Sequence, residues 1–223
     1  ILEPAAGIGV FLDTMPESLN RCNIDSIEID MLTATILRHK HHNINIVCAG
    51  FEKIYFGNKK YDLIISNPPY GKAKLFDESQ KDLKHLYIHH YFLAKSARLL
   101  KDNGIIAMVL PSFVLDNNTQ HARDIIAESG VNLILAYRLP DDLFNGATVT
   151  VDIAFFKKCN WDNSWTKTIY KKIDNHRLSI NQYYENRENH ILGTLAAVPM
   201  YDRIGLTCKS TKDLQEHFDN LTN

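Results

Sequence analysis

Four consecutive residues, Asn67-Pro68-Pro69-Tyr70, carry the groups best suited to chemistry in this sequence. The two prolines have a fixed φ and no N–H, and each disfavours helical backbone in the residue before it. The Asn67 side chain and the Pro68 carbonyl can therefore be held as two fixed acceptors. If each accepts one N–H of a ring-bound amino group, the nitrogen lone pair is freed for attack while Tyr70 stacks on the ring. The alternative is a strand that simply ends in a Pro-Pro loop.

A second candidate site lies at the start of the chain. There the sequence predicts the end of a strand, then a turn of small residues, then the start of a helix. The small residues would let a ligand approach the backbone, and the helix start would offer free N–H groups. Packing alone also produces Gly-x-Gly turns between strands and helices, so both explanations stay open. The residues of this turn are Glu3, Pro4, Ala5, Ala6, Gly7, Ile8 and Gly9, followed by Phe11 in the helix.

Glu28 lies 21 residues after Gly7, at the end of a predicted strand over residues 24–29. In nucleotide-binding α/β units, a carboxylate about 20 residues beyond the glycine turn accepts hydrogen bonds from the ribose hydroxyls. The spacing predicts this role for Glu28. Asp30 precedes an expected helix over residues 31–39, and there we favour helix capping over ligand binding.

Short buried strands alternate with helices over residues 1–130, which predicts a mostly parallel sheet with helices on both faces. Further strands are expected at residues 44–48, 61–66 and 105–110, and helices at 86–100 and 117–129. Two closing strands, 131–139 and 149–156, would pair antiparallel at the edge. The expected fold is α/β, with a seven-stranded Rossmann-like sheet. Residues 1–158 would form the catalytic domain, residues 71–84 a mobile loop over the site, and residues 159–223 an extension packing on the domain.

The composition narrows the class of protein. The 223 residues are 45% hydrophobic with a net charge of -1, so the overall charge does not indicate a nucleic-acid partner. The four cysteines form no C-x-x-C pair, which argues against a zinc site or a disulfide framework. No stretch is long enough to span a membrane, so we expect a cytoplasmic protein without a membrane partner. A strand already ending at Leu2 indicates a fragment of a longer polypeptide.

The segments 3–9, 26–30 and 67–70 resemble the cofactor, ribose and catalytic motifs of S-adenosylmethionine-dependent DNA adenine-N6 methyltransferases, in the motif order of the gamma group. Residues 138–158 resemble the methylase-like region of large plasmid and phage proteins that fuse such a domain to a helicase. The resemblance implies a class I methyltransferase that methylates adenine N6 in DNA within a restriction-modification or antirestriction protein of bacterial, plasmid or phage origin. A base inside a duplex cannot reach a buried site, so the target would be flipped or single-stranded.

The resemblance also assigns residues to roles. The cofactor S-adenosyl-L-methionine would contact Glu3, Pro4, Ala5, Ala6, Gly7 and Gly9 with its methionine end, Glu28 with its ribose and Phe51 with its adenine. The other expected cofactor-binding residues are Phe11, Ile29, Gly50 and Asn67. The target amine would be held by Asn67, Pro68, Pro69 and Tyr70, the flipped base would stack on Tyr70 and Phe144, and no metal is expected.

Two departures from the family pattern bear on function. Gly50 stands where relatives carry an acidic side chain, so the cofactor is expected to bind loosely unless Glu52 supplies the missing acceptor. The residues after Lys158 are too few for a large recognition domain, so further domains or subunits are expected to read the target.

Three competing functions stay open at this point. Amino methyltransferases that act on ribosomal RNA or on protein glutamine also use Asn-Pro-Pro-Tyr, although the Glu3-Pro4-Ala5 opening favours DNA. A non-catalytic nucleic-acid-binding module of a helicase assembly is the third. Four lysines could contact phosphate in any nucleic-acid complex, but exposed lysines are usually just solvated. They are Lys157, Lys158, Lys171 and Lys172.

Overall fold

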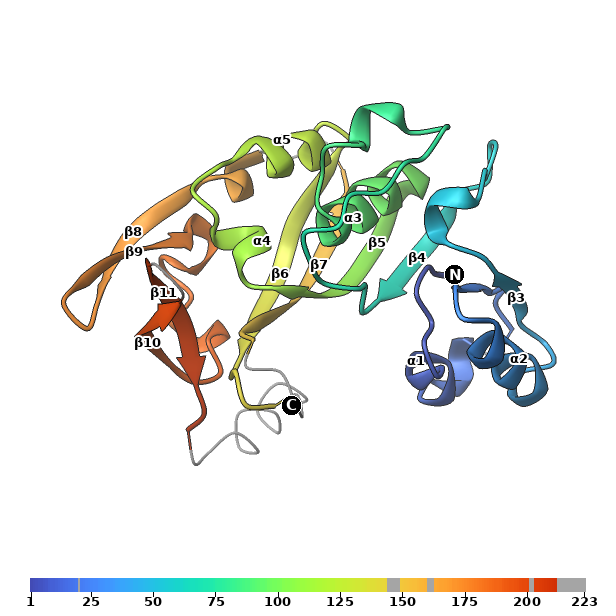
Figure 1. The fold of residues 1–223 in the computed structure, drawn as a ribbon, viewed down its shortest axis with the longest axis horizontal. Helices are drawn as coiled ribbons and strands as arrows, with labels where there is room; N and C mark the ends of the chain where they lie inside the picture. The colour runs from blue at the N-terminus through green and yellow to red at the C-terminus, as the bar shows by residue number, and fades with distance from the viewer. Residues whose placement is uncertain (20, 144–148, 160–162, 201–202, 212–223) are drawn as a thin grey trace.

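A seven-stranded sheet with the strand order β3-β2-β1-β4-β5-β7-β6 forms the centre of the computed structural model (Figure 1). Only β7 runs antiparallel to its neighbours, and all other pairs within the sheet are parallel. The predicted α/β class, the mostly parallel sheet and the antiparallel closing pair are therefore confirmed. The structure describes residues 1–19, 21–143, 149–159, 163–200 and 203–211.

The bounds of the elements follow the predicted alternation closely. The sheet strands are β1 (Leu2–Glu3), β2 (Asp25–Glu28), β3 (Asn45–Cys48), β4 (Tyr61–Ser66), β5 (Leu100–Pro111), β6 (Val131–Leu139) and β7 (Val151–Lys158). The helices are α1 (Val10–Asp13), α2 (Met31–Lys40), α3 (Ile88–Leu99), α4 (Phe113–Asp116) and α5 (His121–Ala127). Two hairpins follow, β8 (Thr168–Ile173) with β9 (His176–Asn181), and β10 (Thr194–Met200) with β11 (Arg203–Lys209).

Side chains of the central strands divide between two cores because successive residues point to opposite faces. In β4, Ile64 joins the larger core with α3, whereas Leu63 and Ile65 pack against the smaller core that contains Leu37 of α2. Helices thus cover both faces of the sheet, as expected. In Figure 1, α1 and α2 lie beside β3 at one end of the sheet, and the two hairpins lie at the other end.

Two segments differ from their predicted form. The expected helix over residues 117–129 is shorter, because only α5 (His121–Ala127) forms there, and the separate short helix α4 (Phe113–Asp116) precedes it. β5 begins at Leu100 rather than at the expected residue 105, so residues 101–104 belong to the strand instead of separating it from the preceding helix. Leu100 pairs with Tyr61 and Ile105 with Leu63, so the intervening residues bulge out of the ladder, with Asn103 at a φ of 63°. A bulge of this kind keeps both strands paired while absorbing extra residues.

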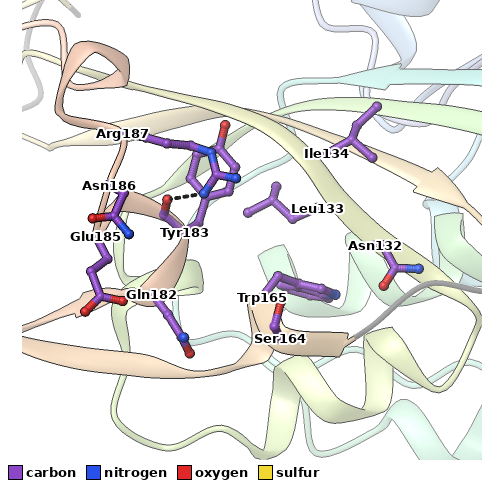
Figure 2. Close-up of a pocket in the computed structure, with 10 residues that line it drawn as sticks. All are labelled: Asn132, Leu133, Ile134, Ser164, Trp165, Gln182, Tyr183, Glu185, Asn186 and Arg187. Carbon is purple, nitrogen blue, oxygen red and sulfur yellow. Dashed lines mark hydrogen bonds between the residues drawn. The ribbon is translucent and has the colours of Figure 1, made fainter.

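The residues after β7 cover the outer edge of β6. Trp165 donates its indole N–H to the Val131 carbonyl at 3.2 Å, and the Tyr183 hydroxyl accepts from the Ala136 N–H at 3.1 Å. A cavity of about 480 Å³ remains between this layer and the first residues of β6, and Figure 2 shows Trp165 and Tyr183 facing it from the extension side. These contacts satisfy an edge that would otherwise expose unpaired backbone groups. The residues after β7 therefore pack along β6.

A buried ionic cluster ties β6, β7, α4 and the extension together. Arg138 donates two hydrogen bonds to the Asp152 carboxylate, both at 2.9 Å, and lies 2.7 Å from Asp116. Tyr184 donates to Asp152 at 2.9 Å and places its ring 4.6 Å from the guanidinium. Arg138 and Asp152 are fully buried. Removing one partner would leave an uncompensated charge in the interior, so the cluster locks these elements in one arrangement.

Candidate active site

The candidate site lies at the carboxyl ends of β1, β2 and β4, where the strand order reverses direction. β1 pairs with β2 on one side and with β4 on the other, so Glu3, Glu28 and Asn67 come from neighbouring strands at one edge of the sheet. Ligands of open α/β sheets bind in the crevice at this reversal point. The topology therefore brings the three predicted motifs to one place.

The turn after β1 needs its two glycines for different reasons. Gly9 has a φ of 86°, and a Cβ added there would lie 2.5 Å from the Leu37 side chain, so packing alone accounts for it. Gly7 has a φ of 53° and nothing within 4 Å of the position of a Cβ. The space beside Gly7 is thus open to a ligand. Helix α1 is a single turn, so the expected contribution of its N-terminus is small.

Two carboxylates lie below this turn. Glu28 accepts the Gly7 N–H and the Asp30 N–H, both at 2.7 Å, so it fixes the turn as well as facing the site. Glu3 is 1% exposed, and its Oε2 has no hydrogen-bond partner among the described residues. Burial, with a contribution from the charge of Glu28, raises the pKa of Glu3 to about 8. A cationic ligand would satisfy both carboxylates.

Other residues of the cofactor turn lie where a ligand could reach some of them. Ile29 is 72% exposed directly after Glu28, which gives an open apolar surface beside the carboxylate. Asp30 caps α2 by accepting the Thr33 N–H at 2.8 Å, as favoured from the sequence. Pro4 and Ala6 are buried, and Ala5 and Phe11 are half-buried.

The segment after β3 departs from expectation at Phe51. Its ring is 2% exposed and packs 5.0 Å from Phe92 and 6.2 Å from Tyr91, measured between ring centroids. A ring enclosed in this way has no free face, so the expected stacking of Phe51 on a cofactor adenine is corrected to a core role. The aromatic side chains of α3, which the local sequence around Phe51 does not reveal, cause this burial.

Glu52 occupies the space that Gly50 leaves. Both Glu52 carboxylate oxygens lie 2.5 Å from the position of a Cβ built on Gly50, whose φ of -69° is ordinary for any residue. The carboxylate therefore stands where an acidic side chain at position 50 would begin. This geometry favours the explanation in which Glu52 supplies the acidic acceptor that Gly50 lacks.

A buried lysine missed in the sequence analysis holds the loops of the site. Lys95 of α3 is 1% exposed and donates to the Phe51 carbonyl at 2.7 Å, the Ile54 carbonyl at 3.0 Å and Asp77 at 2.7 Å. It joins the segment after β3 to the loop after Tyr70. Its signal in the sequence is a single lysine in the otherwise apolar central turns of the helix.

The Asn67–Tyr70 turn directly follows β4. Pro68 is buried while Asn67 is exposed, and the Tyr70 hydroxyl lies 2.8 Å from Asn67 Oδ1 and 3.2 Å from the Val109 carbonyl. Burial, aided by the charge of Asp152, raises the pKa of Tyr70, so its hydroxyl keeps its proton. That one proton has two acceptors. A shift towards Val109 would free Asn67 Oδ1 for an incoming N–H.

Several expectations concern features other than this turn. Phe144 is outside the described residues. In the described part of the chain, no group of three or more His, Cys, Asp or Glu residues is placed to hold a metal ion, and no helix there is long and apolar enough to cross a membrane. The cavity in Figure 2 adjoins Asn132, Leu133 and Ile134 at the amino end of β6, the opposite edge of the sheet from Asn67.

Comparison with known proteins decides the family. The model of the Eco57I restriction-modification methylase family matches residues 15–144, more than half of the chain. The chain belongs to this family. The Eco57I-family match includes Glu28, Gly50 and the whole Asn67–Tyr70 turn, whereas the turn after β1 precedes it.

Relatives of this Eco57I-family chain include two type II methyltransferases. M.AccI of Acinetobacter calcoaceticus is 28% identical over 78% of this chain and 34% of its own length. M.HincII of Haemophilus influenzae is 28% identical over the whole chain and 47% of its own length. The chain thus spans between a third and a half of these relatives.

A solved structure from Listeria monocytogenes, assigned to the class I S-adenosylmethionine-dependent methyltransferases, has the same fold. Its TM-score is 0.58 at 17% identity, over 72% of this chain and 54% of that one. The Eco57I-family domain therefore has the class I methyltransferase fold.

Proposed function

We propose that this domain transfers a methyl group from S-adenosyl-L-methionine to the N6 amino group of adenine in DNA. The observation that carries the proposal is the turn at the end of β4, where the Tyr70 hydroxyl contacts the Asn67 side-chain oxygen, at the same edge of the sheet as Glu3 and Glu28. Membership of a restriction-modification methylase family supports DNA as the substrate. Other domains or subunits would read the target sequence.

The residues present fit this cofactor. S-adenosyl-L-methionine supplies an electrophilic methyl group on a positively charged sulfur, and it carries an ammonium group as well. Glu3 would compensate positive charge, Glu28 would accept the ribose hydroxyls, and the open space at Gly7 would admit the methionine end. Ile29 would cover the nucleoside from its exposed side.

Asn67, Pro68 and Tyr70 would act on the target base. Asn67 Oδ1 and the Pro68 carbonyl would each accept an N–H of the amino group, which frees the nitrogen lone pair for in-line attack. Tyr70, which is 37% exposed, would offer its ring to the base once its hydroxyl donates to Val109 alone. The amine proton leaves after transfer, so the arrangement needs no strong base.

Cofactor affinity should depend on pH through Glu3. The carboxyl group is largely protonated below its pKa of about 8 in the free protein, and a bound cation favours the ionised form. Binding therefore releases a proton, and the dissociation constant should fall by up to about ten-fold per unit between about pH 6 and pH 8. Calorimetry in buffers of different ionisation enthalpy measures the release. Glu3→Gln should abolish this proton release. Equal cofactor affinities of the original protein at about pH 6 and about pH 8 would contradict the proposed contact between Glu3 and the cofactor.

Glu52→Ala should weaken S-adenosylhomocysteine binding by roughly three-fold to a hundred-fold, because the substitution removes a charged acceptor for the amino group of the cofactor's adenine ring. Gly50→Asp should add little, since its side chain would have to displace the Glu52 carboxylate. The exposed neighbour Lys53 provides the control as Lys53→Ala. An unchanged dissociation constant for Glu52→Ala, combined with tighter binding by Gly50→Asp, would show instead that position 50 lacks its acceptor.

The class of acceptor is tested by incubating the protein with methyl-tritiated cofactor and, separately, DNA, RNA and protein. We expect label in DNA, with single strands labelled at least as well as duplex because the base need not be flipped. Label confined to RNA or protein would point to one of the other amino methyltransferase classes. Cofactor binding without transfer to any of the three would favour the non-catalytic module.

A further inference from the structure

A second groove begins just beyond the candidate active site. It encloses about 490 Å³ between α4, the β8–β9 hairpin and the β10–β11 hairpin, and its lining includes Phe113, Tyr170, Arg177 and Arg203. Figure 1 shows α4 between the sheet and these hairpins. The groove is therefore a joint feature of the sheet domain and the extension.

The groove is continuous with the end of β5 that adjoins Tyr70. The Tyr70 hydroxyl contacts the Val109 carbonyl, and Ser112, three residues later, donates its N–H to the Thr150 carbonyl at 2.9 Å. Ser112, Phe113 and Thr150 all line the groove. A chain held there would lead directly to the Asn67–Tyr70 turn.

One face of the β8–β9 hairpin is both aromatic and cationic. Tyr170 lies opposite Ser179, and Lys172 lies opposite Arg177, so all four share one face of the two-stranded sheet. The other face carries Ile169 and Ile180, which pack into the larger core. Tyr170 is 53% exposed, and the Arg177 guanidinium lies 4.7 Å from its ring centroid.

The cations of this surface are free, unlike the neighbouring ones. The half-buried Lys158 donates to the Ala97 and Leu100 carbonyls, and Lys171 pairs with Glu188 at 2.6 Å. By contrast, Lys172, Arg177 and Arg203 are exposed, and none of the three forms an ion pair with any carboxylate that the structure describes. Unpaired cations beside exposed rings suit a polyanion with aromatic groups.

We propose that this groove binds the DNA strand that carries the target adenine, with Arg177, Arg203 and Lys172 on its phosphates and a neighbouring base stacked on Tyr170. The identity of the strand rests on the proposed function. Phosphate contacts give affinity that falls with salt, and stacking on an aromatic ring gives affinity that tolerates any base. The extension would thus hold the substrate without reading its sequence.

The test measures fluorescence anisotropy of a labelled single-stranded DNA oligonucleotide at several salt concentrations. Combining Arg177→Ala with Arg203→Ala should weaken binding about ten-fold and reduce the slope of log affinity against log salt by about 1.4, at roughly 0.7 per phosphate contact. Tyr170→Ala should weaken binding about five-fold or more with the slope nearly unchanged, because stacking releases no counterions.

The matched control combines Arg21→Ala with Lys101→Ala, two basic residues beside a hollow at the amino ends of the strands, on the opposite edge of the sheet. This variant should bind DNA like the original protein. Equal losses in the control and the groove variant, or no loss in either, would overturn the proposal. Tighter arginine-dependent binding to RNA of the same sequence would overturn the assignment to DNA. Affinity for S-adenosylhomocysteine, measured on the same proteins, tests the proposed function separately, because no groove variant should change it.

Discussion

Asn67→Ala is expected to reduce methyl transfer by at least about a hundred-fold while leaving the dissociation constant of S-adenosylmethionine within a few-fold. Asn67 Oδ1 is the side-chain acceptor at the end of β4, and within the described part of the chain its hydrogen-bond donor is the Tyr70 hydroxyl, at 2.8 Å. Without that oxygen the target amine keeps its delocalised lone pair. The measurements are single-turnover transfer of tritium and calorimetric titration of the cofactor.

Asn58→Ala is the matched control, because Asn58 is exposed in the turn before β4 and lies at the opposite end of that strand from Asn67. It should leave both transfer and cofactor binding unchanged. If Asn67→Ala kept a rate close to that of the original protein, Asn67 would have no part in activating the amine. The Asn67–Tyr70 turn would then be structural.

Asp152→Ala is expected to destabilise the protein by about 3–5 kcal/mol, because it leaves the guanidinium of Arg138 with half of its compensation in the interior. The Tyr184 hydroxyl loses its acceptor in the same step. Urea unfolding followed by circular dichroism measures the change in the free energy of unfolding.

Asp62→Ala removes an aspartate of the same kind from the surface, where its carboxylate pairs with Lys101 at 2.9 Å and its side chain is 77% exposed. This control should not move the unfolding midpoint measurably, because exposed pairs are screened by solvent. Equal midpoints for the two variants would mean that the cluster around Arg138 does not hold the extension to the sheet.

Local chemistry explains which parts of the site could be predicted from the sequence. Two consecutive prolines end a strand because neither has an N–H to donate to the neighbouring strand, and Pro68-Pro69 follow the end of β4 in this way. Asp30 caps α2 by accepting a hydrogen bond from the N–H of Thr33, three residues later. The alternation of short strands and helices fixed the fold class for a similar reason. Each of these signals acts within a few residues.

The features that could not be predicted depend on distant partners. Phe51 is buried because α3, some 40 residues later, presents Tyr91 and Phe92 to it. Arg138 and Asp152 are charged residues in strands, and nothing nearby in the sequence indicates that they neutralise each other in the core. The Glu52 carboxylate lies over Gly50 because of the rotamer of its side chain. Composition and residue spacing do not determine that rotamer.

The proposed role of the Asn67–Tyr70 turn is to activate the amino group of adenine for methylation. Its most direct test is to react the protein with S-adenosylmethionine and DNA, digest the DNA to nucleosides and identify the methylated nucleoside by mass spectrometry, with Asn67→Ala in parallel. We expect N6-methyldeoxyadenosine from the original protein and nearly none from the variant. Methylated cytosine, or N6-methyldeoxyadenosine in equal amounts from both proteins, would contradict it.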